Sequence, residues 1–255
     1  MTKKNNTRKY ILLISVTALL IAGLVVGLSQ AKYKTEKIMT GKVRFTAKLA
    51  ENLAIQEHSA EREHDGSYKL LIDEDPVQDQ AYKLMPGVDV PKDPFITVTG
   101  KTELPGWLFV EVVPGADFPA EVTYAVRSSE DATADDPGYW IDTGLTGDHG
   151  GKVYVYYKSI VTADTQTTSG EGDAAATTLT EFYVLATDGR GNTLTVSQDL
   201  DRETNAKLDF YAYLCQVITQ PEAASGETAP SKDAIAAAAA ADFTTCFGSN
   251  SSNNG

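Results

Sequence analysis

The feature that most limits the fold is a series of short segments in which apolar and polar side chains alternate. Residues 206–218 place mostly apolar side chains at the even positions, and residues 107–113 are apolar on both sides apart from Glu111. A period of two puts successive side chains on opposite faces of a strand, and an apolar run without alternation is typical of a central strand covered on both faces. Roughly nine or ten such strands without a βαβ rhythm predict an all-β fold, a jelly-roll-like antiparallel β-sandwich.

The stretches between these strands are expected to be turns and loops. The charged residues 57–66 predict a loop, and the polar residues 162–178 predict a long loop or insertion. The sequence Asp-Gly-Arg-Gly-Asn at 188–192 predicts a hairpin turn that joins strands at 179–186 and 193–197.

One short C-terminal helix is expected after the sandwich domain, which we assign to residues 50–220. Ser231 can cap a helix that begins at Lys232, and an unbroken alanine run follows at 236–241. Gly248 is expected to end it. Residues 221–248 therefore form a linker and an alanine-rich helix, and residues 249–255 form a disordered tail.

The first 31 residues have the pattern of a signal peptide. An apolar run at 10–28 follows four positive charges and ends in Ser29-Gln30-Ala31, which fits a signal peptidase site after Ala31. The positive charges are Lys3, Lys4, Arg8 and Lys9. An uncleaved membrane anchor is the alternative, because the run is nearly long enough to span a bilayer. In both cases the rest of the chain lies outside the cell, and only this segment meets the membrane.

The charge and the cysteines restrict the partners and the compartment. The net charge of −13 becomes −17 once the four positive leader charges are removed, which argues against binding nucleic acid or anionic lipid. Cys215 and Cys246 are compatible with one disulfide in an oxidising space, and two free thiols are the alternative.

No residue pattern predicts catalysis. The chain has three histidines and no His-Glu-x-x-His, no Gly-x-Ser-x-Gly and no phosphate-binding glycine loop. His58 and His64 lie six residues apart in the charged stretch and are expected to be solvated. We therefore expect no enzyme, no catalytic residue and no zinc site.

Two acidic stretches are weak candidates for calcium, the one cofactor considered. One contains Asp73 and Asp75, and the other contains Asp135 and Asp136. Calcium takes six to eight oxygen ligands, which clustered loop carboxylates can supply. Neither stretch has the spacing of a dedicated calcium loop, so the alternative is a solvated acidic surface.

Several stretches have a recognisable order along the chain. The most specific is Leu-Met-Pro-Gly-Val-Asp-Val-Pro-Lys-Asp-Pro at 84–94, which leads through residues 96–100 to the strand at 107–112. It is preceded by the strand at 40–48 and followed by the strands at 153–158 and 208–216. Together these stretches resemble the TasA/camelysin family of Gram-positive bacteria, whose leaders are cut by a SipW-type signal peptidase. Residues 40–48 are similar to the first strand after the family's leader, and residues 153–158 and 208–216 are similar to its closing strands.

The resemblance implies a jelly-roll domain that is exported to the cell surface or the biofilm matrix. In fibre-forming members the strand at the mature N-terminus is donated to the neighbouring subunit, which carries over here to residues 32–49 and above all to Thr40–Leu49. A donated strand needs one apolar face, and Val43, Phe45, Ala47 and Leu49 supply it. The alternative is that this strand pairs within its own subunit. Cys215, where aliphatic residues are usual in the family, departs from the pattern and suggests a staple to the terminal helix.

Three hypotheses follow for the function. The first is a structural matrix or surface protein that assembles head to tail with itself, or with other matrix proteins, by donor-strand exchange into fibres. The second is a monomeric extracellular binding module that uses calcium at the acidic stretches. The third is a secreted metallopeptidase, an activity assigned to some relatives, although a recognisable zinc motif is missing here.

Overall fold

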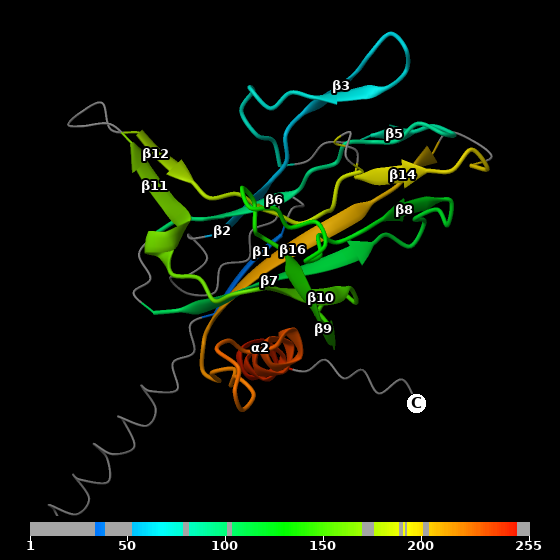
Figure 1. Cartoon of the computed structure of the whole chain (residues 1–255). Helices are drawn as coiled ribbons and strands as arrows, with labels where there is room; N and C mark the ends of the chain where they lie inside the picture. The colour runs from blue at the N-terminus through cyan, green and yellow to red at the C-terminus, as the bar shows by residue number, and fades with distance from the viewer. Residues whose placement is uncertain are drawn as a thin grey trace, which may run out of the picture. The chain divides into compact units, whose positions relative to one another are not determined.

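The computed structural model describes residues 34–38, 53–78, 82–100, 104–169, 176–188, 191, 193–200 and 204–248. The chain divides into two compact units, residues 1–32 and residues 33–255, and the description below concerns the second (Figure 1). The predicted leader with Ser29 and Ala31, and the predicted donor strand with Val43, Phe45, Ala47 and Leu49, lie outside the described residues.

A five-stranded antiparallel sheet forms the larger layer, in the order β1-β16-β7-β10-β9. Its strands are β1 (Lys34–Ile38), β16 (Leu208–Gln216), β7 (Gly106–Pro114), β10 (Lys152–Tyr156) and β9 (Trp140–Thr146). The two nine-residue strands, β7 and β16, lie side by side near the middle, where Leu208 pairs with Pro114 and Gln216 with Gly106.

The second layer is assembled from shorter strands. A three-stranded sheet has the order β13-β6-β2, from β13 (Phe182–Tyr183), β6 (Phe95–Val98) and β2 (Leu53–Gln56). Two further pairs are β14 (Leu194–Val196) with β8 (Val122–Tyr124), and β15 (Thr204–Asn205) with β5 (Lys83–Leu84). β2 also lies against β1 and β16, which brings this layer onto the larger sheet.

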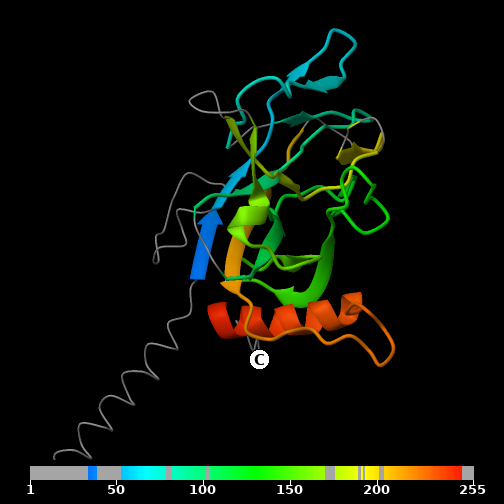
Figure 2. The ribbon, with the colours of Figure 1, turned by 60° about the vertical axis from the view of Figure 1, so that its left-hand side comes forward.

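Two ribbons complete the strand set. One joins β3 (Ala60–Arg62) to β4 (Tyr68–Leu70), and both views show it at the end of the unit away from the helix (Figures 1 and 2). The other joins β11 (Gln166–Ser169) to β12 (Ala176–Leu179) after the 3₁₀ turn Thr162–Thr165. The predictions of plain loops at 57–66 and 162–178 are therefore wrong in part, because each stretch contributes to a paired ribbon.

The main core lies between the layers, and β7 shows how the strand sequence creates it. Leu108, Val110 and Val112 point into this core, where they join β6 residues such as Ile96. Trp107 and Phe109 point to the opposite face and belong to a second apolar cluster under the helix. β7 is therefore covered on both sides, as its unbroken apolar sequence predicts.

The helix α2 (Lys232–Phe247) lies across the outer face of the large sheet (Figure 2). The side chain of Ser231 accepts a hydrogen bond from the Ala234 N–H, and Gly248 ends the helix with a positive φ of 84°. Both ends lie where the sequence predicts them, because Ser satisfies a free N–H at a helix start and Gly adopts positive φ without strain. Phe243 and Phe247 pack on Phe109 and Tyr213 of the sheet.

The all-β class with one short C-terminal helix is thus confirmed. The finer jelly-roll assignment stays a prediction. The hairpin expected at 188–192 is wrong: β13 pairs with β6 and β14 pairs with β8, so the strands flanking that stretch do not pair with each other. Phe182 and Leu194 are both buried in the main core, and each strand takes the partner that allows this burial. Among the described residues, no helix is long and apolar enough to cross a membrane.

Candidate functional site

The N-terminal strand β1 occupies one edge of the large sheet. It pairs antiparallel with β16, from Lys34 opposite Cys215 to Ile38 opposite Tyr211. Its first residue lies three positions after the predicted cleavage site at Ala31. The strand that the structure describes therefore lies upstream of the predicted donor strand at 40–49 and within the predicted donor segment 32–49.

The neighbouring strand β16 is almost wholly enclosed. Seven of its nine residues are buried, from Leu208 through Cys215 with the exception of the half-buried Asp209. One side of its backbone pairs with β7 and the other with β1. A strand with such a buried surface needs both neighbours, because an open edge exposes unpaired N–H and C=O groups.

A group of charged side chains lies inside the second layer. Glu57 and His58 directly follow β2, and Lys92 and Asp93 lie just before β6. Together with Tyr82, these residues are called the interior charge cluster below. All five are buried.

The prediction that His58 is solvated is wrong, because its ring packs at 5.1 Å from Phe95 and pairs with Asp93. The stretch 57–66 is charged, but its first two residues, Glu57 and His58, directly follow β2 and are buried.

One ion pair and the hydrogen bonds between His58 and Asp93 hold the interior charge cluster together. The Lys92 ammonium lies 2.8 and 3.0 Å from the two carboxylate oxygens of Glu57. His58 Nδ1 lies 2.8 Å from one Asp93 oxygen, and the His58 backbone N–H donates to the other at 3.0 Å. Burial raises the pKa of Asp93, while the hydrogen bonds from His58 act in the opposite direction.

The hydroxyl of Tyr82 in this cluster has no hydrogen-bond partner among the described residues. Its oxygen is buried, and the Tyr82 ring lies 5.6 Å from the Lys92 ammonium. Burial, followed by the negative charges of Glu57 and Asp93, raises the pKa of Tyr82, so this hydroxyl stays protonated. A buried hydroxyl without a partner is rare in folded proteins and calls for an explanation.

Outside the interior charge cluster, the buried carboxylate of Glu111 fixes the turn between β9 and β10. It accepts hydrogen bonds from the Tyr213 hydroxyl at 2.5 Å and from the backbone N–H groups of His149 and Gly151 at 2.9 and 2.8 Å. His149 Nδ1 lies 3.0 Å from the same carboxylate, and the His149 ring stacks on Tyr211 at 3.5 Å. Four contacts match the capacity of a carboxylate, which favours a structural role.

The buried carboxylate of Asp242 in α2 ties the helix to the sheet. It accepts from the indole N–H of Trp107 at 3.1 Å and from the backbone N–H groups of Ile218 and Thr219 at 2.8 and 2.9 Å. Cys215 of β16 is joined to Cys246 of α2 by a disulfide. The helix is thus held by one covalent bond and one buried carboxylate.

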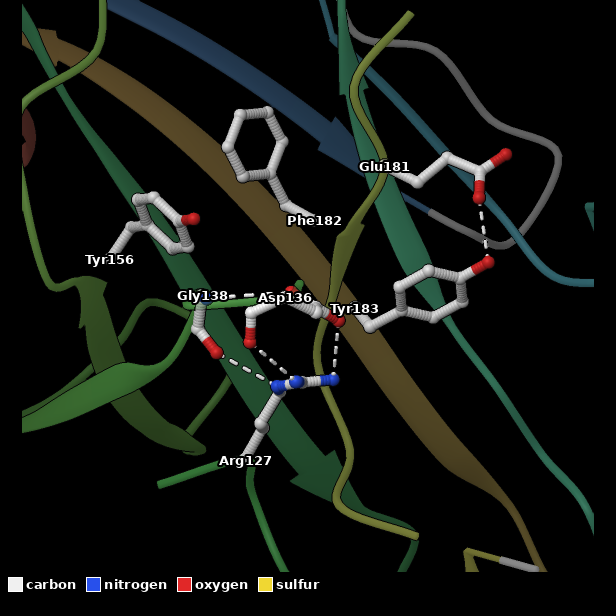
Figure 3. A pocket seen from close by; sticks show the side chains of 7 residues that line it. All are labelled: Arg127, Asp136, Gly138, Tyr156, Glu181, Phe182 and Tyr183. Carbon is white, nitrogen blue, oxygen red and sulfur yellow. Dashed lines mark hydrogen bonds and ion pairs between the residues drawn. The ribbon is translucent and has the colours of Figure 1, made fainter. Parts of the chain in front are cut away.

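A small pocket lies near Arg127 (Figure 3). Its volume is about 170 Å³ with the solvent at its mouth, which is below the usual range for small-molecule sites. The Arg127 side chain donates to the Gly138 carbonyl at 2.7 Å and pairs with Asp136 at 2.9 Å. Because the guanidinium is already bound, the pocket offers little to a charged ligand.

The calcium candidates are separated in the structure. Asp73 and Asp75 are exposed in the turn after β4, and Asp135 and Asp136 are exposed in the loop before β9. Asp136 pairs with Arg127, which competes with a cation for its charge. In the part of the chain that the structure describes, no group of three or more His, Cys, Asp or Glu residues could hold a metal ion.

No model of a known protein family, no curated protein and no solved structure matches the chain. The four buried carboxylates, Glu57, Asp93, Glu111 and Asp242, escaped prediction because their partners are distant in the sequence. The sequence did contain a signal for the interior charge cluster. An acidic residue followed by a basic one, Glu57-His58, precedes by 35 residues a basic residue followed by an acidic one, Lys92-Asp93, so that each residue can contact one of the opposite type.

Proposed function

We propose that the protein is a secreted structural protein of the cell surface or biofilm matrix, not an enzyme, and that it assembles into fibres by exchange of its N-terminal strand. The observation that supports this most is the position of β1 at the edge of the large sheet, beside the buried strand β16. Removal of the leader after Ala31 by a signal peptidase would free the chain end just ahead of this strand. The resemblance to the TasA/camelysin family agrees with the proposal.

Strand exchange needs a strand that can dissociate from its own sheet, and a sheet edge that is unstable until another strand pairs with it. β1 has five residues and pairs with one strand of the large sheet, so few hydrogen bonds retain it. β16 is buried along most of its length, so its free edge would be costly. The β1 segment of a neighbouring subunit can satisfy that edge with the same hydrogen bonds.

A head-to-tail exchange makes an open filament. Each subunit donates β1 at one surface and receives a strand beside β16 at another, so the contact does not close on itself. The apolar residues at 43–49 would extend the donated segment, in accordance with the prediction from the sequence.

Electron microscopy of the mature protein tests the assembly. We expect fibres from the protein that begins at Lys32, and soluble monomers after deletion of residues 32–49. Fibres that persist after this deletion would remove the N-terminal segment from the mechanism. Intact mass of the exported protein locates its N-terminus and decides between cleavage and an anchor.

A cysteine trap separates exchange from pairing within one subunit. Lys37 lies opposite Ala212 in the register of β1 and β16, and opposite residues in an antiparallel pair are close enough for a disulfide. The variant with Lys37→Cys and Ala212→Cys should give reductant-sensitive ladders on a denaturing gel when fibres form. Intramolecular disulfides alone would show that β1 stays in its own subunit. Each single-cysteine variant is the control.

A further inference from the structure

Lys92 and Glu57 form an ion pair that is almost wholly withdrawn from water. The Glu57 side chain has no exposed surface and that of Lys92 is 9% exposed, while Nζ lies within 3.0 Å of both carboxylate oxygens. Lys and Glu are seldom buried to this extent, since a charge loses its hydration when it enters a protein interior.

Both partners are held rigidly in place. Pro91 and Pro94 flank the Lys92-Asp93 dipeptide, and the Thr193 hydroxyl donates to the Lys92 carbonyl. The Glu57 backbone exchanges two hydrogen bonds of 2.8 Å with Val77. The Nζ–oxygen distances of 3.0 and 2.8 Å keep the amine beside the carboxyl group. Well-oriented intramolecular reactions reach effective concentrations of about 10⁵–10⁸ M, and here a rotation of the carboxyl group is still needed to bring Cδ to Nζ.

We infer that Lys92 and Glu57 condense to an intramolecular isopeptide bond, which makes this pair a site of self-modification. The ammonium first gives one proton to the carboxylate, so that a neutral amine faces a neutral carboxyl group. The carboxyl group turns its face to Nζ, and the nitrogen lone pair forms a bond to Cδ. The nitrogen then loses a second proton, one Cδ–O bond breaks, and that oxygen leaves as water. One ammonium and one carboxylate thus become one amide and one water, with no oxidant or other reactant.

The rest of the interior charge cluster provides the groups that this step needs. Asp93 follows Lys92 in the chain and lies close enough to Glu57 for their charges to interact. Burial raises the pKa of Asp93, so its carboxyl group can supply the proton for the departing oxygen and regain one from the nitrogen. The unpartnered Tyr82 hydroxyl is a protonated donor beside the same charges. It can stabilise the negative oxygen that develops on Cδ and then bind the neutral amide oxygen.

Withdrawal from water also favours the product. A buried ion pair retains the free-energy cost of desolvating two charges. Replacement of such a pair by uncharged groups often leaves the stability of the protein unchanged or raises it. The amide removes both charges and releases one water molecule from a site where Glu57 is fully covered. At the protein surface, by contrast, hydration stabilises the separate ions.

The inference is independent of whether the protein forms fibres, and intact mass spectrometry tests it directly. After reduction of the disulfide and denaturation, the purified wild-type protein should be lighter than its sequence by the mass of one water molecule. Digestion should give one branched peptide that joins Glu57 to Lys92, with no tryptic cleavage after Lys92. A reduced wild-type protein with the full sequence mass would overturn the inference.

Three variants locate the bond. Lys92→Arg keeps the positive charge but lacks a reactive amine, so it should have the full mass. Loss of water in Lys92→Arg would place the reaction elsewhere, for example at an Asp-Gly sequence, and would refute the assignment. Glu57→Ala should likewise have the full mass. Asp93→Asn should fold and form the bond at least tenfold more slowly in a time course after refolding; an unchanged rate would exclude Asp93 as the proton donor.

Discussion

The substitution Asp242→Ala should weaken the attachment of α2 to the outer face of the large sheet. It removes the acceptor of three N–H groups, those of Trp107, Ile218 and Thr219. The Trp107 side chain is almost fully buried, so its indole N–H cannot turn to water instead. The two backbone groups are partly buried and regain some hydration.

The expected magnitude follows from these three contacts. A buried donor left unpaired costs about 1–3 kcal/mol, and each hydrogen bond to a charged group contributes about 1.5–3 kcal/mol before rehydration is counted. Some of this loss is offset because the variant no longer buries a charge. We expect the free energy of unfolding to fall by about 3 kcal/mol for Asp242→Ala, and by about 2 kcal/mol for Asp242→Asn, which keeps one acceptor oxygen.

Urea unfolding at constant pH measures this effect. With an m value of about 2–3 kcal/mol/M, the midpoint of Asp242→Ala should fall by roughly 1 M, and m should stay unchanged. Asp233→Ala is the matched control, because Asp233 lies exposed in the first turn of the same helix. It should cost less than about 1 kcal/mol through its interaction with the helix dipole. Equal losses in the two variants would refute the role assigned to Asp242.

Three further predictions concern other parts of the fold. Gly147→Ala should destabilise the protein by about 2 kcal/mol in the same urea assay, because a Cβ there would lie 2.3 Å from Cδ of the buried Glu111. Replacement of both Cys215 and Cys246 by alanine should lower the free energy of unfolding by roughly 3.5 kcal/mol on the chain-entropy estimate for the 31-residue separation, measured against the oxidised wild type. The third concerns Asp93, whose raised pKa means that its favourable contribution is present at low pH and lost as pH rises through that pKa. The stability advantage of the wild type over Asp93→Asn should therefore shrink as the pH rises from about 4, the ordinary pKa of Asp, through the raised pKa of Asp93, and an advantage that grows with pH would contradict the assignment.

The elements that the sequence predicts well are those whose local pattern agrees with their tertiary surroundings. The strand at 107–113 is apolar on both sides, and β7 does lie between the main core and the cluster under α2. The helix has a serine cap, an alanine run and a terminal glycine, and all three signals depend on neighbouring residues alone. Such signals do not require knowledge of distant partners.

The failures occur where distant partners decide the structure. Residues 188–192 carry strong turn residues, yet the strands on either side pair with β6 and β8 because these pairings bury Phe182 and Leu194. His58 lies in a charged stretch, and only Asp93, 35 residues away, makes its burial favourable. Asp242 could have been noticed, since helical spacing places it on the same face as Ala238 and Ala239, which are buried.

The disulfide and the proposed acceptor site for a neighbouring strand meet at one residue. Lys34 of β1 lies opposite Cys215, which is also bonded to Cys246 of the helix. If a neighbour's β1 takes this place, a pull on the fibre reaches β16 through its hydrogen bonds with the donated strand. Cys215 then passes part of that force covalently into α2, and Asp242 fixes the same helix to Trp107 of β7. The disulfide and Asp242 thus stabilise the strand on which assembly would depend, which gives a physical reason for a disulfide at Cys215.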